Sequence, residues 1–102
     1  MIAKRFVADP VRLQRRLDVA AAITRLNALQ LRHRQMLGGA EIDIARLEMI
    51  VDGGGGTEVH RAALCEARMQ QQVIYTAMAR CDDELAALNA QLEVIDREIS
   101  VG

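Results

Sequence analysis

Four positions near the middle of the chain carry the residue types best suited to chemistry. Gln30 and His33 stand in the first half, and Met78 and Cys81 in the second. Imidazole, thioether and thiolate groups together can hold a soft ion such as Cu(I). Each type occurs here once, without a repeated Cys or His spacing, so a polar layer that fixes the register of two packed helices explains them with fewer assumptions. We therefore expect no metal and no cofactor.

Two further patterns suggest chemistry only superficially. Asp82, Asp83 and Glu84 form an acidic run, but neighbouring residues of a helix point about 100° apart, so this run reads as a solvated face. The segment Gly53 to Gly56 lacks the Gly-Lys-Ser/Thr ending of a phosphate-binding loop, so it reads as a turn. The sequence pattern shows no nucleophile beside a base, and we expect no catalytic residue and no enzyme.

Basic residues gather in the first part of the chain. Residues 1–39 hold eight Lys or Arg against two Asp or Glu, whereas residues 40–102 hold five against twelve. In a hairpin the basic start of one helix lies beside the acidic end of the other, so the asymmetry is largely compensated. No aromatic stacking residues or recognition motif accompany the arginines, which leaves nucleic-acid binding as the weaker alternative.

The elements that position these residues follow from the spacing of mostly apolar side chains. On both sides of the four glycines such residues recur at alternating intervals of four and three, and the partners across the turn have numbers with one fixed sum. We call these residues the seam; the pairs are Val51 with His60, Leu47 with Leu64, Ile44 with Ala67, Ala40 with Gln71, Leu37 with Ile74, His33 with Met78, Gln30 with Cys81, Leu26 with Leu85, Ile23 with Leu88, Val19 with Leu92, and Arg16 with Ile95. The pattern predicts an all-α fold, an antiparallel two-helix coiled-coil hairpin. Pairing of two hairpins into a four-helix bundle stays open.

Start and stop signals give the bounds of the helices. Asp9 is a natural N-cap before Pro10 at the first helical position, and Thr57 is the natural cap of the second helix. Gly38 and Gly39 weaken the first helix, and a break there would give three helices; the seam keeps its phase across them, so we expect a continuous helix. The expected organisation is a tail over 1–8 and one hairpin domain over 9–100, with helix one at 10–52, the turn at 53–56 and helix two at 57–99.

The two cysteines and the start of the chain bear on its compartment. Cys65 and Cys81 are sixteen residues apart on one predicted helix, about 24 Å at 1.5 Å per residue, so they cannot form an intrachain disulfide. A reducing compartment fits this best. Met1 to Ala8 has no apolar stretch of signal-peptide length, and we expect a cytoplasmic protein without membrane insertion.

The positions that flank the seam carry charges and an apolar edge. The register predicts three ion pairs, Glu48 with Arg61, Glu41 with Arg68 and Arg15 with Glu98. We call the other flank the apolar edge; it comprises Ala22, Leu29, Met36, Ile50, Ala63, Val73, Ala77 and Val94. Such an edge usually marks a contact surface, either for a homodimer or for a different protein with an apolar helix face.

The architecture also resembles a known family. The capped start at Asp9 and Pro10, the spacing of Leu13, Leu17 and Ala20, and a returning helix with Leu85, Leu88, Leu92 and Ile95 are similar to the FliJ/YscO type of stalk protein of flagellar and type III secretion systems. The resemblance implies a cytoplasmic export component that inserts its coiled coil into a hexameric secretion ATPase and handles chaperones. It carries over no functional residue.

The function expected from these observations is a non-enzymatic protein–protein interaction module, such as a secretion-system stalk, adaptor or chaperone, acting through its coiled-coil surface. A self-assembling homodimeric scaffold is the alternative.

Overall fold

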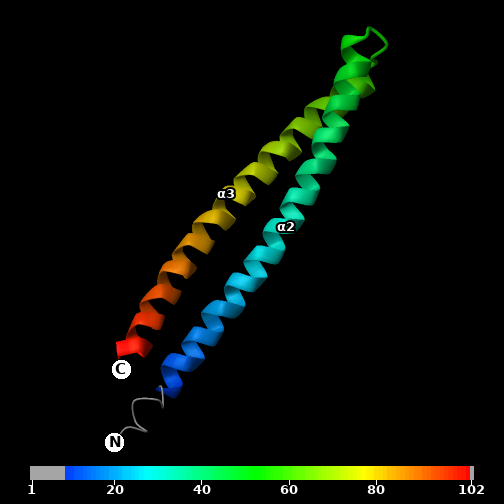
Figure 1. The fold of residues 1–102 in the computed structure, drawn as a ribbon. Coiled ribbons are helices and arrows are strands. Elements are labelled where there is room, and N and C mark those ends of the chain that lie inside the picture. Colours follow the sequence, from blue (N-terminus) through cyan, green and yellow to red (C-terminus); the bar gives the residue numbers. More distant parts are fainter. Residues whose placement is uncertain (1–8, 102) are drawn as a thin grey trace, which may run out of the picture. The chain divides into compact units, whose positions relative to one another are not determined.

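Two long helices make up the part of the chain that the computed structural model describes, residues 9–101 (Figure 1). Helix α2 spans Pro10–Asp52 and helix α3 spans Glu58–Val101, with residues 53–57 between them. No strand occurs in residues 9–101. The predicted all-α pair of helices is confirmed, whereas the tail expected over 1–8 lies outside the described residues.

Both helices begin at the caps that the sequence indicates. The Val11 amide donates to Asp9 Oδ1 at 2.9 Å, which satisfies one of the free N–H groups of the first turn of α2. At α3 the His60 amide donates to Thr57 Oγ1 at 3.4 Å, and the Thr57 amide donates to His60 Nδ1 at 3.1 Å. This is a capping box in which an imidazole takes the usual place of Glu or Gln. Thr57 therefore precedes α3 instead of starting it.

Helix α2 runs through Gly38 and Gly39 without a break. A Cβ atom built at either glycine meets nothing within 4 Å. The expectation of one continuous helix is therefore confirmed. Helix α3 ends at Val101, two residues beyond the expected 99.

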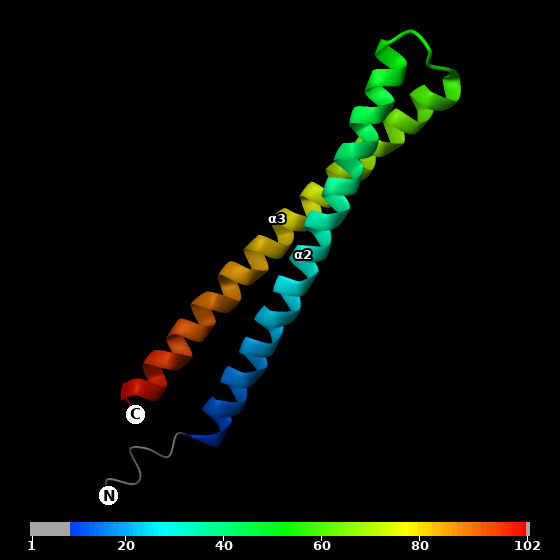
Figure 2. The same ribbon diagram turned by 45° about the vertical axis from the view of Figure 1, so that its right-hand side comes forward.

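The chain divides into two compact units, each of which contains part of both helices. We call residues 30–80 the loop half, because the glycine turn joins its two helical segments (Figure 2). We call residues 9–29 with 81–101 the open half. The earlier expectation of one hairpin domain stays a prediction.

The seam residues form the core of each half. None of them is exposed, and every buried residue within residues 9–100 belongs to the seam. In the loop half Ile44, Leu47 and Leu64 form one apolar cluster, against which Val51 and Ala67 pack. In the open half Val19 is 7% exposed and Ile95 is completely buried. Burial thus follows the four-three spacing, which is how one stripe of each helix packs against the other.

The predicted ion pairs of the loop half are wrong in their partners. Glu48 contacts Arg68 at 3.8 Å, while Arg61 contacts Glu58 of its own helix at 3.3 Å. Side chains lean toward the N-terminus of their helix, so those of α2 lean away from the glycine turn and those of α3 lean toward it. Glu48 and Arg61 therefore diverge, whereas Glu48 and Arg68 converge. The predicted pair of Glu41 with Arg68 is wrong for the same reason, because these two side chains also lean apart.

The open half also changes one partner. Glu98 contacts Arg12 at 3.7 Å instead of Arg15, and Arg16 donates from Nε to Asp96 at 2.6 Å. Arg12 and Arg16 continue the spacing of the seam and face α3 more directly than Arg15 does. The hydrogen bond and the negative charge of Asp96 raise the pKa of Arg16. The basic start of α2 is thus compensated by acidic groups of α3.

Two glycines of the turn provide a test of its backbone. Gly54 has a φ of 81°, which L-residues with a Cβ rarely adopt, whereas Gly55 has ample space and an ordinary φ. We expect Gly54→Ala to lower the free energy of unfolding by about 1 kcal/mol. Gly55→Ala should leave it unchanged or raise it slightly. Urea unfolding followed by circular dichroism measures both, and equal effects would contradict the assigned turn.

Candidate protein-docking surface

The polar layer is built by three residues of the loop half. Gln30 is 4% exposed, and its Nε2 donates to the Met78 carbonyl on α3 at 3.1 Å. Its Oε1 lies 3.1 Å from His33 Nδ1. An amide oxygen only accepts hydrogen bonds, so the imidazole carries its proton on Nδ1 in this arrangement. The layer therefore ties α2 to α3 through the hydrogen bond of Gln30 with the Met78 carbonyl, and the contact with His33 orients the Gln30 amide within α2.

Cys81 belongs to the open half and makes a separate hydrogen bond to α2. Its Sγ donates to the Leu26 carbonyl at 3.4 Å. Within residues 9–101 no three His, Cys, Asp or Glu side chains gather in a way that could hold a metal ion. The buried polar groups at these positions make the contact between the helices specific, because each must face its hydrogen-bond partner.

Gln30 supplies a test of the layer. Replacing it by Ala removes a buried side chain and leaves the His33 Nδ1 proton without its acceptor, so Gln30→Ala should lower the free energy of unfolding by about 1–3 kcal/mol. Gln70→Ala, at an exposed position of α3 in the same half, serves as the matched control and should have an effect within about 0.5 kcal/mol. Similar losses for both variants would contradict a structural role for the layer.

The two cysteines differ in environment, and both are free thiols. Cys65 is exposed, whereas Cys81 is 3% exposed. Burial raises the pKa of Cys81, and the charges of Asp82 and Glu84 raise it further. The folded chain thus holds the Cys81 proton more tightly than the unfolded chain does.

This difference predicts a pH-dependent stability. The contribution of Cys81 is fully present below the ordinary thiol pKa of about 8.5 and is lost as pH rises beyond it. The free energy of unfolding should therefore fall above that pH, and Cys81→Ala should remove this part of the slope. Cys65→Ala is the control and should retain it. Urea titrations between neutral and alkaline pH measure the slopes.

A hydroxyl and an imidazole also meet at the start of α3. Thr57 Oγ1 lies 2.9 Å from His60 Nδ1, although the sequence pattern indicated no nucleophile beside a base. The same two atoms serve the cap, because Thr57 Oγ1 accepts the His60 amide and Nδ1 accepts the Thr57 amide. Both groups are thus engaged in starting the helix, and the absence of an enzyme activity stays a prediction.

The apolar edge contributes exposed side chains in the loop half. Met36 on α2 is 51% exposed and Val73 on α3 is 65% exposed, while Ile50, Ala63 and Ala77 are half-buried. Exposed apolar groups of this size gain most from contact with another apolar surface.

The remaining members of the apolar edge lie in the open half. Leu29 is 40% exposed, Val94 is 42% exposed and Ala22 is half-buried. The loop half therefore carries the more accessible members.

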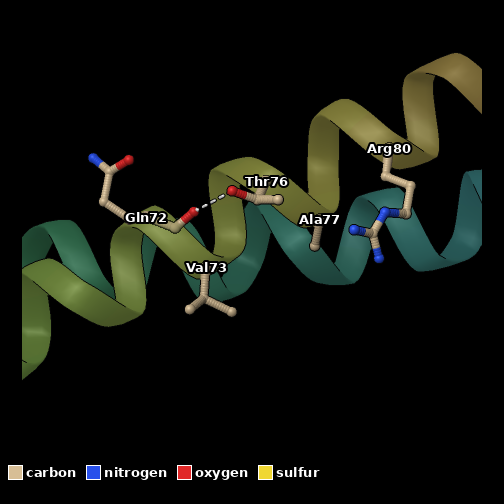
Figure 3. Close-up of a pocket in the computed structure, with 5 residues that line it drawn as sticks. All are labelled: Gln72, Val73, Thr76, Ala77 and Arg80. Atoms are coloured by element: carbon tan, nitrogen blue, oxygen red, sulfur yellow. Dashed lines mark hydrogen bonds between the residues drawn. The ribbon is translucent and has the colours of Figure 1, made fainter.

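A shallow hollow accompanies the apolar edge on α3. Gln72, Val73, Thr76, Ala77 and Arg80 line it, with a volume of about 350 Å³. Figure 3 shows Val73 and Ala77 pointing to the same side of the helix. Thr76 Oγ1 donates to the Gln72 carbonyl at 3.0 Å, so its hydroxyl is satisfied within the helix. The floor is thus small and apolar, and Arg80 supplies a cation at one end.

Several exposed apolar side chains were missed by the sequence reasoning. On α2 the most exposed in the loop half are Met49 at 78%, Ile42 at 70% and Leu31 at 56%. They repeat the four-three spacing of the seam on the opposite side of the helix. Counting that spacing for every face, rather than for the seam alone, would have found them.

Comparisons with known proteins found no match, so the function of this chain is inferred from the geometry of the described residues. No protein family model, no curated protein and no solved structure matches this chain. In the described part of the chain, neither helix has a stretch apolar and long enough to span a bilayer.

Proposed function

We propose that this chain is a non-enzymatic protein–protein interaction module that binds a helical segment of another protein through the apolar edge of its loop half. The observation that carries the proposal is the exposure of Met36 and Val73, with the hollow beside Ala77. Side chains of this type, accessible on a rigid helix, are suited to packing against an amphipathic partner helix.

Apolar anchors and one charged residue would have separate roles in binding the partner helix. Val73 and Met36 supply buried area, and the hollow has room for a side chain of the partner. Arg80, at the end of the hollow, favours an acidic residue there and so sets the orientation of the partner helix. The central apolar contacts would provide most of the affinity, as in other interfaces.

The resemblance to FliJ/YscO-type stalk proteins gives this module a cellular setting. We propose a cytoplasmic secretion-system stalk, adaptor or chaperone. Its support is the pair of long helices, Pro10–Asp52 and Glu58–Val101, joined by a short glycine turn. The two free cysteines suit a reducing compartment.

A homodimeric scaffold remains the second candidate, favoured by the number of exposed apolar side chains on so small a chain. A nucleic-acid binder is less favoured, because Arg12 and Arg16 are engaged by Glu98 and Asp96. The scaffold would form a dimer at micromolar concentration without any partner.

The module is tested by substitutions on the apolar edge. The double variant Met36→Glu with Val73→Glu should reduce partner capture about tenfold or more, because two anchors become charged. The measurement is quantitative recovery of crosslinked partners from the native cells, with circular dichroism to verify helicity. Both positions are exposed, so helicity should not change.

Met69→Glu is the matched control, because Met69 is also an exposed methionine, 65% accessible, and lies outside the apolar edge. It should capture the same partner in the same amount as the unmodified chain. Equal capture by the double variant would refute the docking role of the edge. Recovery of the chain's own dimer alone would favour the scaffold.

A further inference from the structure

The face of α2 that looks away from the seam carries a second apolar stripe. We call it the outer stripe; in the loop half it consists of Leu31, Gln35, Gly38, Ile42, Ala45 and Met49. The intervals alternate between four and three, as in the seam, and none of these residues is charged. Such a spacing on a helix matches the surface of another helix.

Helix α3 has no equivalent in the loop half. The positions of α3 equivalent to the outer stripe begin with the charged Glu58 and contain Met69 as their one exposed large apolar side chain, while the exposed Val59 and Val73 lie beside them. Helix α2 is therefore apolar on two opposite sides and α3 on one. A helix with apolar residues on opposite sides is suited to a place between two other helices, and α3 fills only one side.

Gly38 lies in the middle of the outer stripe, and no contact within its own chain explains why this residue is a glycine. A Cβ at Gly38 would meet no atom within 4 Å, so no intrachain contact requires a glycine. Glycine nevertheless weakens a helix relative to alanine. A missing side chain on an apolar helix face lets a bulky group from another helix approach the backbone closely.

We propose that the outer stripe is an interface between two copies of this chain, in which their α2 helices pack antiparallel and Ile42 of each copy lies over Gly38 of the other. The spacing of the stripe reads the same in both directions, as a two-fold interface requires. With the axis at Ala40, Leu31 meets Met49 of the second copy and Gln35 meets Ala45. Large residues thus face small or flexible ones along the contact.

Charges on one flank of the stripe favour the same occupant, whereas those on the other flank and near the axis oppose it. Arg34 and Glu48 lie on the favourable flank, and the proposed register brings Arg34 of each copy opposite Glu48 of the other, twice by symmetry, where Arg34 would share Glu48 with Arg68 of its own chain. On the other flank Arg46 would approach Arg32 of the second copy, but it already contacts Asp43 of its own helix at 3.6 Å. Glu41 of the two copies meets near the axis, so Glu41→Gln should strengthen the dimer.

The test is the self-association of the full chain, measured by sedimentation equilibrium over micromolar concentrations. The unmodified chain should dimerise. Ile42→Glu should weaken the dimer at least tenfold, whereas Met69→Glu, of similar exposure on α3, should not. A monomeric unmodified chain, or equal association of Ile42→Glu, would overturn the proposal.

The two interior glycines offer a sharper comparison. A Cβ at Gly38 or Gly39 meets nothing within 4 Å, and both positions are helical. Leucine at either position should therefore increase helix stability. Only Gly38→Leu would fill the space that Ile42 of the second copy occupies in the proposed interface. Gly38→Leu should thus raise the unfolding midpoint and weaken the dimer. Gly39→Leu, whose two copies would meet on the flank beside the axis, should raise the midpoint without weakening the dimer. Equal association of the two variants would exclude the close approach at Gly38.

This interface is separate from the apolar edge of the proposed function, and the variants distinguish their failures. Met36→Glu should leave self-association intact and Ile42→Glu should leave partner capture by the edge intact. Loss of the dimer in Met36→Glu with retention in Ile42→Glu would place the contact between copies on the edge and overturn the outer-stripe interface.

Discussion

A single row of side chains from each helix holds α2 and α3 together within each half of the chain, and the rest of the structure depends on that row. Two helices without a third element bury only one stripe each, so the seam supplies nearly all the burial available to a lone hairpin. Ile44, Leu47 and Leu64 provide this in the loop half. Gln30 adds a hydrogen bond to the Met78 carbonyl of α3, and this bond depends on the register of the two helices.

The same constraint determines what the surface contains. Because the seam uses one stripe of each helix, no apolar side chain outside it is buried in residues 9–100, and several are largely exposed, as for Met36, Ile42 and Val73. A small chain with this much exposed apolar surface gains stability from a partner or from another copy. Two faces of the loop half are available for such contacts, and they differ in the chemistry beside them.

The amount that could be predicted from the sequence differs between features for physical reasons. Helix type, the caps at Asp9 and Thr57 and the buried positions follow from local rules, namely hydrogen-bonding side chains before a helix and the four-three spacing. The ion pairs of the loop half failed because two residues at the same level of antiparallel helices still lean in opposite directions, and Glu98 contacts Arg12 because Arg12 faces α3 more directly than Arg15 does. The exposed side of α2 was overlooked because only one face had been tested for periodicity. The partner of the apolar edge is a different molecule, and the residues of this chain specify only the chemistry of its contact surface, an apolar helix face with an acidic group opposite Arg80.

The short glycine turn has a consequence for the order in which the chain assembles. Contacts between the helices near the turn, such as Leu47 with Leu64, join residues 17 apart, whereas Arg16 and Asp96 are 80 apart. Closing a long segment costs more conformational entropy than closing a short one, so contacts beside the turn form at the lowest cost and shorten the remaining closures. We therefore expect the helices to pair from the turn toward the open half. The contacts of the open half, where partners are most distant in sequence, should separate first and rejoin last.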